Sequence, residues 1–445
     1  MKPKNYIYDL FLSPAWYFYM TGAVFLFFIS FFFSVLFEAA VMYSVGVLLF
    51  TVIDFYLLFV RKGGIVATRS MQSRFSLGDN NNVTVSLQNQ YAFKARLRII
   101  DELPEQFQER NFLLFTEMAP RGKEKLSYIL KPTTRGVFEF GNVLCFVRSP
   151  LRLIQRRFST DGETNIKVYP SFQQLKKYQL IATSDNYVAG MKKVRRLGHS
   201  IEFEKIKNYV PGDDVRTINW KATARSSSIM VNTFTDARQQ QVYCLLDKGR
   251  AMKMPFDGLT LLDHSINAAL ALLNITLLKN DRAGLVTFAD KVDDMVVSEK
   301  RTGQLNHLTE ALYKQQTDFK ESSYEALWMA LHRGVTQRSC LILFTNFETY
   351  SSLERQLPYL KRMASRHLLY VVFFQNTLLK HIHETEPDTT EGIYIKTIAE
   401  RFDFEKRQIV KELRRHGILS ILTTPQALTV DAINKYLELK ARQLL

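Results

Sequence analysis

The residues with the clearest chemical potential lie where two apolar segments end. Asp247 directly follows the apolar run at residues 242–246, and Asn346 comes two positions after the run at residues 340–344. If both runs are parallel strands of an open α/β sheet, their carboxyl ends meet where such sheets bind ligands. A hard divalent cation needs several oxygen ligands at once, whereas this pair supplies one carboxylate and one amide. The sequence therefore predicts a binding edge with an incomplete set of metal ligands.

Familiar catalytic motifs are missing from the sequence. It contains no Gly-x-x-x-x-Gly-Lys-Ser/Thr, no Gly-x-Gly-x-x-Gly, no Gly-x-Ser-x-Gly and no His-Glu-x-x-His. His381 and His383 form a His-x-His pair, but their polar, acidic surroundings favour a solvated loop over a metal site. We therefore expect neither an enzyme activity nor a cofactor.

The densest run of polar and charged side chains is residues 198–225. Asp213 and Asp214 are adjacent acids, which would suit acid–base chemistry, but no nucleophile accompanies them. The basic residues that follow favour structural ion pairing instead: Arg216, Lys221 and Arg225. Trp220 lies between apolar neighbours and is predicted to bury its ring. The segment is thus interpreted as a self-paired plug that docks a loop on the following domain.

Apolar periodicity indicates the framework that positions these side chains. Continuous apolar runs, typical of buried parallel strands, lie at residues 242–246, 283–288, 340–344, 368–374 and 418–422. Helical periodicity separates them at residues 259–279, 397–416 and 429–443. Ser-x-x-Glu capping boxes beginning at Ser322 and Ser351 predict two more helices. Alternating strands and helices indicate a parallel sheet with helices on both faces.

An earlier segment, residues 74–170, has the shorter alternation of a β-domain. Residues 82–88 and 136–141 alternate with period two, and turn-forming residues separate such runs. This pattern predicts a small β-sandwich, preceded by a polar, basic linker at residues 61–75. Three widely spaced cysteines form neither a disulfide framework nor a zinc pattern, and so indicate a reducing compartment: Cys145, Cys244 and Cys340.

Two long apolar segments near the N-terminus are typical of membrane-spanning helices. Residues 10–37 contain no charged side chain, and residues 39–60 contain only Asp54. A bilayer core about 30 Å thick is crossed by about 20 helical residues, so each segment is long enough to span it. Asp54 is interpreted as a helix-end residue that reaches the interface.

Charge predicts the orientation of these segments. The turn between them holds Glu38 and no basic residue, whereas basic residues flank the outer ends: Lys2, Lys4, Arg61, Lys62, Arg69 and Arg74. The positive-inside rule places both termini in the cytoplasm, at the inner membrane. The chain carries a net charge of +16 with basic clusters at residues 148–157 and 192–196. Attraction to the lipid bilayer accounts for them better than nucleic-acid binding, because no nucleic-acid motif accompanies them.

Residues 198–225 closely resemble the signature of the domain-of-unknown-function 58 family. Asn219 stands where the family more often has Asp, and the matching positions are Glu202, Tyr209, Pro211, Gly212, Asp213, Asp214, Arg216, Ile218, Trp220, Lys221, Ala222 and Arg225. The resemblance extends to the apolar hairpin, to residues 135–138 and 149–151, and to the α/β part.

The resemblance implies a von Willebrand factor A-like C-terminal domain. Such domains often hold Mg²⁺ through Asp-x-Ser-x-Ser and residues of later loops. Asp247 matches the Asp, but Gly249 and Ala251 replace both serines, and Asn346 falls where a later Asp belongs. We therefore expect no metal. Family members commonly accompany MoxR-type AAA ATPases and other von Willebrand A proteins, and some such gene sets are linked to aerotolerance.

These features predict five parts along the chain. A cytoplasmic N-terminus (1–14) and two transmembrane helices (15–60) precede the β-sandwich-like domain (61–170). A linker carrying the signature (171–238) then leads to a von Willebrand A-like α/β domain with a Rossmann-like parallel sheet (239–445).

The predicted function is a non-enzymatic, membrane-anchored adaptor that works with a MoxR-type ATPase in complex assembly or in stress tolerance such as aerotolerance. The loops at residues 247–255 and 345–350 are expected to contact the partner, with Lys248, Arg250 and Lys253 facing its acidic surface. Two alternatives remain open. One is Mg²⁺-dependent ligand binding through Asp247, and the other is nucleic-acid binding through the basic segments.

Overall fold

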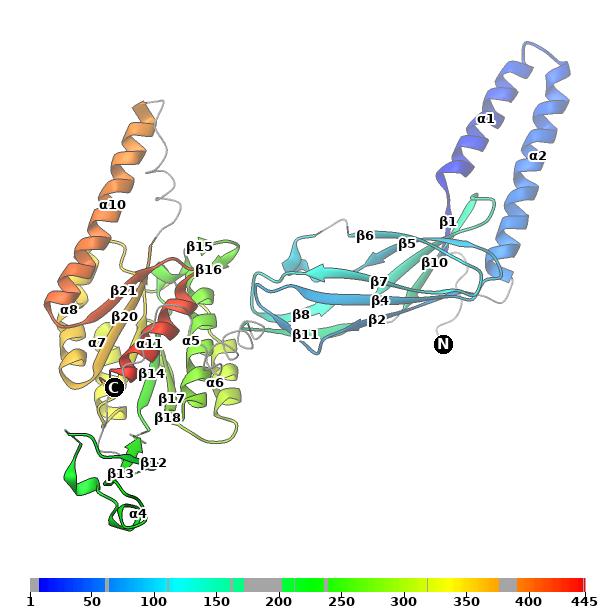
Figure 1. Cartoon of the computed structure of the whole chain (residues 1–445). Helices are drawn as coiled ribbons and strands as arrows, with labels where there is room; N and C mark the ends of the chain where they lie inside the picture. The colour runs from blue at the N-terminus through cyan, green and yellow to red at the C-terminus, as the bar shows by residue number, and fades with distance from the viewer. Residues whose placement is uncertain are drawn as a thin grey trace. The chain divides into compact units, whose positions relative to one another are not determined.

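The chain forms two compact units, Met1–Tyr169 (unit 1) and Pro170–Leu445 (unit 2), and each is described by itself (Figure 1). The structure, a computed structural model, describes residues 8–60, 64–109, 112–160, 163–171, 202–211, 213–235, 239–317, 319–375, 390–442 and 444. The His381/His383 pair, the basic cluster at residues 192–196 and Gly212 lie outside the described residues.

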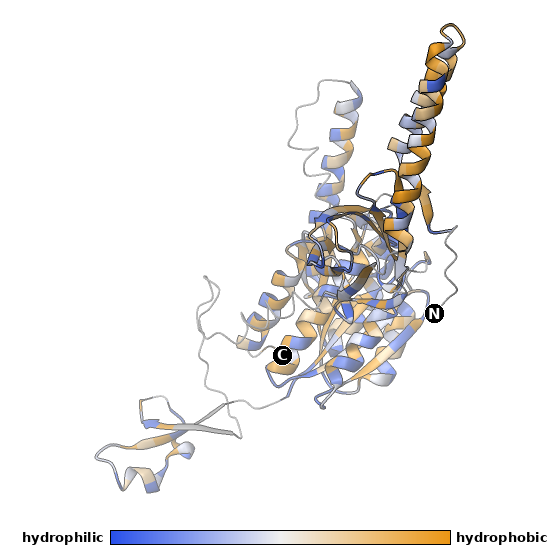
Figure 2. Cartoon of the chain, turned by 90° about the vertical axis from the view of Figure 1, so that its right-hand side faces the viewer, coloured by the Kyte–Doolittle hydropathy of each residue, from blue (hydrophilic) through white to orange (hydrophobic). Residues whose placement is uncertain are grey.

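Unit 1 begins with a short strand and two apolar helices that lie side by side (Figure 1). They are β1 (Leu10–Leu12), α1 (Pro14–Ser30) and α2 (Val35–Phe55), and α2 continues into a π-helical turn, η1 (Tyr56–Val60). The helix over Val35–Phe59 is long and apolar enough to cross a membrane, whereas α1 has 17 residues. Both helices are hydrophobic along their length (Figure 2).

The rest of unit 1 is rich in β-strands arranged in three sheets. Their strand orders are β1-β10-β9-β5-β6, β2-β4-β7 and β3-β11-β8. The strands are β2 (Ile65–Met71), β3 (Arg74–Ser76), β4 (Asn81–Asn89), β5 (Ala95–Asp101), β6 (Leu113–Met118), β7 (Lys123–Leu130), β8 (Gly136–Phe140), β9 (Val143–Arg148), β10 (Ile154–Thr160) and β11 (Thr164–Tyr169). The alternation predicted at residues 82–88 is confirmed by β4, whose Val83, Val85 and Leu87 are buried.

The predicted linker at residues 61–75 is wrong over most of its length. β2 and β3 occupy residues 65–71 and 74–76, and the side chain of Arg69 is buried in an ion pair with Asp101 of β5. Its guanidinium also lies 5.1 Å from the ring centre of Phe140. The basic residue that sequence reasoning placed at a membrane surface therefore joins two sheets inside the β-rich region.

Asp54 fixes the base of α2 to the turn between β9 and β10. Its side chain is fully buried and accepts hydrogen bonds from the Ser149 hydroxyl and from the backbone N–H groups of Leu153 (3.0 Å) and Ile154 (3.3 Å). Because a buried carboxylate is costly unless donors surround it, this arrangement requires the turn to stay in place. Asp54 lies in the last turn of α2, as predicted for a helix-end residue, and its buried side chain serves as a structural connector to this turn.

Arg156 and Tyr91 complete the base of α2. Both donate to the Leu58 carbonyl, from Arg156 Nη1 at 2.6 Å and from the Tyr91 hydroxyl at 2.9 Å. The Arg156 guanidinium also lies 4.6 Å from the ring centres of Phe59 and Phe158. These contacts satisfy a carbonyl that the end of the helix leaves without an intrahelical partner.

The α/β region of unit 2 is built on a six-stranded sheet of order β18-β17-β14-β19-β20-β21. All neighbours pair in parallel except β17 and β18, which are antiparallel. The strands are β14 (Gln241–Asp247), β17 (Arg282–Phe288), β18 (Val292–Glu299), β19 (Cys340–Phe344), β20 (Leu368–Phe374) and β21 (Leu419–Thr423). Five strands confirm the predicted apolar runs, and the half-buried edge strand β18 was missed.

Helices cover both faces of this sheet (Figure 1). One face packs against α5 (Leu261–Leu278), α6 (Gln304–Tyr313) and α11 (Leu428–Ala441), and the other against α7 (Tyr324–Gly334), α8 (Tyr350–Arg366) and α10 (Thr390–Arg415). Side chains of β14 alternate between the two cores. α5 is apolar enough to resemble a membrane span, but 83% of it is buried, so it is a core helix.

The role of Asp54 predicts a local effect on the β9–β10 hairpin. Asp54→Ala leaves several buried donors without an acceptor, and we expect a loss of about 3 kcal/mol. Hydrogen exchange of peptides covering residues 143–160 should accelerate by about 100-fold. Glu38→Ala, in the exposed first turn of α2, is the matched control and should leave this exchange unchanged. Equal exchange in the two variants would show that Asp54 does not hold the turn.

Candidate functional site

The candidate site lies at the carboxyl ends of β14 and β19. These strands are parallel neighbours, with Leu246 opposite Phe344. β14 is the first strand of the sheet and β19 the fourth, so the chain order reverses between them, which is where open α/β sheets bind ligands. Thr260 and Asp263 form the capping box of α5, and Thr349 and Ser352 form that of α8, so the flanking helices start at defined positions.

Four donors surround the Asp247 carboxylate, which is 3% exposed. The Gly249 N–H donates to Oδ1 at 2.8 Å, and the Ser322 hydroxyl donates to the same oxygen. Oδ2 accepts from the Thr345 hydroxyl at 2.6 Å and from the Tyr324 hydroxyl at 3.4 Å. The carboxylate therefore joins three chain segments through the protein's own groups.

The absence of a side chain at Gly249 makes this arrangement possible. A Cβ at this position would lie 2.0 Å from Ser322 Oγ and 3.2 Å from the Lys320 carbonyl oxygen. A serine at position 249 is therefore incompatible with the observed position of the Ser322 hydroxyl. The glycine that replaces a metal-binding serine in the resemblance is also the residue that lets Ser322 reach Asp247.

Burial dominates the electrostatics of this cluster. It raises the pKa of Asp247, and the surrounding donors act against that rise. Burial and the neighbouring Asp247 raise the pKa of Tyr324 well above its ordinary value, so its hydroxyl stays protonated. Tyr324 can thus share its proton between Asp247 and the Thr345 hydroxyl oxygen, 2.6 Å away.

The oxygen of Asn346 is also engaged. Lys406 of α10 donates from Nζ to Asn346 Oδ1 at 2.7 Å and to the Phe347 carbonyl. Burial lowers the pKa of Lys406 to about 8. Asp247 and Asn346 are the two side chains that the sequence suggested as cation ligands. Their oxygens instead accept hydrogen bonds from hydroxyl, backbone N–H and amine groups of this chain.

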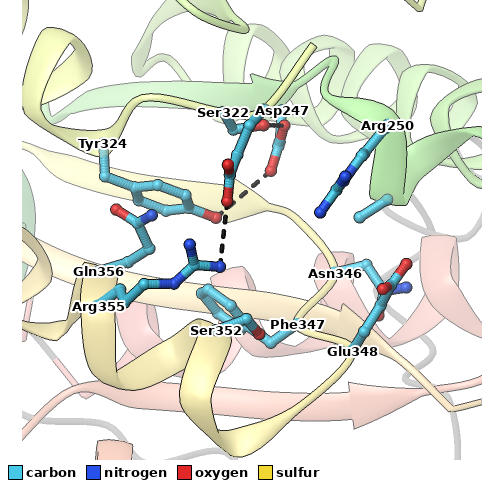
Figure 3. A pocket seen from close by; sticks show the side chains of 12 residues that line it. Asp247, Arg250, Ser322, Tyr324, Asn346, Phe347, Glu348, Ser352, Arg355 and Gln356 are labelled. Atoms are coloured by element: carbon cyan, nitrogen blue, oxygen red, sulfur yellow. Dashed lines mark hydrogen bonds and ion pairs between the residues drawn. The ribbon is translucent and has the colours of Figure 1, made fainter. Parts of the chain in front are cut away.

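A hollow of about 80 Å³ opens beside the cluster. Asp247, Ala251 and Asn346 line it, so the structure brings three of the four predicted positions together. Arg250, from the loop after β14, and Arg355, from α8, extend toward it from different sides (Figure 3). Glu321 and Glu348 also line the hollow, which therefore combines satisfied polar groups with two arginines and two glutamates.

The first loop is less basic at its surface than predicted. Lys248 is buried, and its Nζ lies 2.6 Å from Asp293 Oδ2. It cannot face a partner without breaking this ion pair, so its predicted role is wrong. Arg250 is exposed, and Arg355 forms an exposed ion pair with Glu321 at 3.1 Å. Exposed pairs contribute only about 0–1 kcal/mol, so another carboxylate can compete for Arg355.

The segment with the family-like signature forms a separate hairpin. Glu202 begins β12 (Glu202–Asn208), which pairs antiparallel with β13 (Met230–Thr235). Tyr209 extends the pairing through its N–H, which donates to the Ile229 carbonyl at 2.8 Å. The chain between the strands contains a 3-10 turn, η3 (Val215–Thr217), and a one-turn helix, α4 (Trp220–Thr223). Sequence reasoning predicted a linker here and missed both strands.

The adjacent acids shape the backbone of this hairpin. Asp213 accepts from Lys207 Nζ at 2.8 Å and from the Val210 N–H at 3.0 Å, and these contacts lower the pKa of Asp213. Asp214 accepts from the Arg216 N–H at 2.9 Å. The ion-pair partner of Asp213 is thus Lys207, which lies before the turn, rather than a basic residue after it.

Trp220 is 71% exposed, so the predicted buried anchor is wrong. Two strands and one helical turn provide no second layer against which a large ring could pack. Lys221 and Arg225 are also exposed. Because α4 ends at Thr223, the predicted shared helical face of Lys221 and Arg225 does not form.

Comparison with known proteins identifies the region that contains both features. Residues 205–408 match the family described as "Protein of unknown function DUF58". This region, which is just under half of the chain, is similar to the DUF58 family. The predicted family is thus confirmed, and the DUF58 region includes most of the β12–β13 hairpin as well as Asp247 and Asn346.

A curated relative and two solved structures show further similarity. Bacillus subtilis (strain 168) "Uncharacterized protein YeaD" is 26% identical over 191 residues, which cover 41% of this chain and 47% of YeaD. The SpRpn10 VWA domain has a TM-score of 0.26 and 13% identity, covering 44% of this chain and 95% of that domain. The Pyrococcus furiosus PF1109 CARDB domain has a TM-score of 0.17 and 8% identity, covering 24% and 88%. These TM-scores are too low for either structure to support a conclusion.

Sequence reasoning missed Ser322, Tyr324 and Thr345 as members of the site. Ser322 was assigned to a capping box, but Ser323 caps α7 by accepting from the Ala326 N–H at 3.2 Å. The neighbouring serine is therefore free of that role and bonds Asp247. Thr345 directly follows an apolar strand, which is the one sequence signal that pointed to it.

The Gly249–Ser322 contact predicts non-additive mutations. Gly249→Ala displaces the Ser322 hydroxyl, and Ser322→Ala removes it, so each variant deprives Asp247 of the same donor. We expect each to lower the free energy of unfolding by about 1–3 kcal/mol. In the double variant the loss should be clearly smaller than the sum. Chemical denaturation of the four proteins measures this, and strict additivity would contradict a shared hydrogen bond.

Proposed function

We propose that this DUF58 protein is a non-enzymatic adaptor, anchored in a membrane by α1 and α2, that binds a partner protein at the carboxyl edge of its α/β sheet. One observation carries the proposal. At the switch point of the sheet, the Asp247 carboxylate is satisfied internally, while Arg250 and Arg355 extend toward an open hollow (Figure 3). Such a hollow suits an acidic side chain of a partner.

Chemistry at the site favours binding over catalysis. The hydroxyls of Ser322 and Thr345 both donate to Asp247, and together with the Gly249 N–H they compensate the burial of this carboxylate, which is a structural role. Metal ions prefer several converging oxygen ligands, and within the described residues no group of three or more His, Cys, Asp or Glu side chains could hold one. We therefore favour the adaptor over the Mg²⁺-dependent alternative.

A von Willebrand A-like assignment is part of the proposal. The sheet order, its antiparallel edge strand, and an aspartate at the end of the first strand support it. In this view Gly249 and Ala251 stand where metal-binding serines would be, and Lys406 donates to Asn346 where a metal would otherwise bind. The binding edge keeps its shape because hydrogen bonds of the chain itself hold it.

Membrane anchoring is supported by the apolar helices of unit 1. Most of their large hydrophobic side chains are exposed, as a lipid-facing surface requires: Phe18, Val24, Phe25, Phe28, Phe31, Phe32, Phe33, Met42, Leu48, Leu49, Phe50 and Val52. In water such a surface is a liability. We propose two spans with both soluble parts in the cytoplasm at the inner membrane.

The proposed partner is a MoxR-type AAA ATPase, as the family resemblance implies, with other von Willebrand A proteins as further members of the assembly. Complex assembly or stress tolerance, including aerotolerance, is the proposed process. Arg250 and Arg355 would pair with acidic side chains of the partner in competition with Glu321 and Glu348, which also line the hollow. Attraction of this kind sets encounter rate and specificity and weakens with salt.

The partner site predicts a salt-sensitive complex. Arg250→Glu with Arg355→Glu should weaken binding of the cognate ATPase at least about tenfold, because like charges then oppose an acidic partner. Binding is measured by pull-down of the full tethered protein, with a photo-crosslinker at the exposed position Glu348. Arg414→Glu with Arg415→Glu is the control, since these exposed residues end α10 just before β21 begins, at the opposite edge of the sheet. If the edge variant binds normally while deletion of residues 75–165 abolishes binding, the edge-loop proposal should be abandoned.

The topology predicts the outcome of cysteine labelling. All three native cysteines are buried, so a cysteine placed at the exposed position Lys320 is the reactive site. A membrane-impermeant maleimide should label Lys320→Cys only after the inner membrane is opened. Labelling of intact spheroplasts would place unit 2 on the outer side of the inner membrane and would contradict the proposed topology.

A further inference from the structure

The turn between β9 and β10 is held at the base of the apolar helices. The N–H of Ser13, the residue before α1, donates to the Leu153 carbonyl at 2.9 Å, and the Ser13 hydroxyl donates to the Arg152 carbonyl. From the other helix, Asp54 accepts from the same turn. Residues 149–152, which we call the basal turn, are therefore fixed to both helices.

The basal turn and the residue before it present two arginines to the outside. Arg148 and Arg152 are exposed, and so is Leu151, at 42%. Within the described residues, neither arginine has an ion-pair partner. The other arginines of the cluster differ, because Arg156 is buried against Phe59 and Arg157 lies 3.5 Å from Asp9.

The backbone of Arg152 supports a role for its side chain. Its φ is +63°, in the left-handed region that favours glycine and is costly for a residue with a Cβ. Arg152 N–H donates to the Ser149 carbonyl at 3.1 Å, which closes the turn. The contacts of Ser13 and Asp54 with this turn hold Arg152 in that conformation and so fix the position from which its side chain extends.

The start of α1 marks the level of the membrane interface. Trp16, Tyr17 and Tyr19 lie in its first two turns, and the two tyrosines are 57% and 43% exposed. Tyr and Trp concentrate at the membrane–water interface. The backbone N–H of Trp16 donates to the Ser13 carbonyl at 3.1 Å, and Ser13 contacts the basal turn. The two arginines and this aromatic group therefore lie at the same end of α1.

We propose that Arg148 and Arg152, with Leu151 inserted beside them, form a binding site for the headgroups of anionic phospholipids. The proposal rests on the membrane anchoring of the proposed function. Guanidinium groups bind phosphate through paired, charge-assisted hydrogen bonds. The site would fix the rotation and depth of unit 1 against the bilayer, and through Asp54 it is rigidly linked to α2.

Trp16 provides a local reporter for the test. The chain has three Trp residues, and Trp220→Phe with Trp328→Phe leaves Trp16 alone in the full-length protein. The protein is reconstituted into two vesicle preparations of phosphatidylcholine and phosphatidylglycerol, and in each preparation a different one of the two lipids carries bromine on its acyl chains. Bromine quenches the fluorescence of Trp16, so the ratio of quenching by brominated phosphatidylglycerol to quenching by brominated phosphatidylcholine reports local enrichment of the anionic lipid. Each basic residue near an anionic surface contributes about a fivefold preference, so Arg148→Gln with Arg152→Gln should lower the relative affinity by about 25-fold.

The matched control removes two positive charges from other strands of unit 1, at the end of the β-rich region opposite the apolar helices. β2 (Ile65–Met71) leads away from the end of η1, and Arg74 begins β3 just beyond the far end of β2. Lys131 lies at the same end, because it follows Leu130 of β7, which pairs with Asn81 at the start of β4. Arg74→Gln with Lys131→Gln should preserve the preference. An unchanged ratio in the basal-turn variant, or an equal loss in the control, overturns the proposal. Absence of quenching by brominated phosphatidylcholine in the parent protein instead shows that α1 does not enter the bilayer, which refutes the anchoring itself.

Discussion

The hydrogen bonding of the buried Asp247 carboxylate is the interaction on which the carboxyl edge of the sheet in unit 2 depends. An ionised carboxylate loses several kcal/mol of hydration on burial, and it is tolerated only where donors replace water. Here the donors come from the end of β14, from the segment before α7, from α7 itself and from the end of β19. Satisfying one charge therefore fixes the relative positions of three segments of chain: the loop after β14, the start of α7 and the end of β19. The hollow beside them inherits its shape from this network and needs no bound ion to maintain it.

Unit 1 uses the same physical solution at Asp54. There a buried carboxylate also accepts from a hydroxyl and backbone N–H groups, and the consequence is again that distant segments are held together. In unit 1 the connection runs from an apolar helix to a β-turn, and in unit 2 from one strand end to another. Asp54 and Asp247 thus serve as organising acceptors inside this protein, while Arg148, Arg152 and Arg250 remain exposed.

The sequence predicted the features that depend on local pattern. The continuous apolar runs located β14, β17, β19, β20 and β21 to within a residue or two, because a strand buried on both faces must be apolar throughout. It did not reveal β18, because the edge strand Val292–Glu299 contains acids and has only one covered face. The β12–β13 hairpin was missed because a register shift between Phe203 and Lys205 interrupts the period-two alternation of β12.

The site was only partly predictable for a different reason. Asp247 and Asn346 follow apolar strands and were found from their positions, whereas Ser322 and Lys406 reach the site through tertiary contacts that no spacing encodes. Trp220 shows the opposite error. A large ring between apolar neighbours suggested a core, but burial depends on whether a second layer exists, and the hairpin has none.

The central claim is that the donors of this chain, and not a cation, satisfy Asp247. Calorimetric titration of Mg²⁺ into the full-length protein in detergent tests it directly, with Asp247→Asn as the paired sample. We expect no saturable binding in the millimolar range for either protein, because the donors of the chain already occupy the carboxylate. Tight, saturable binding by the parent protein that Asp247→Asn abolishes would contradict it.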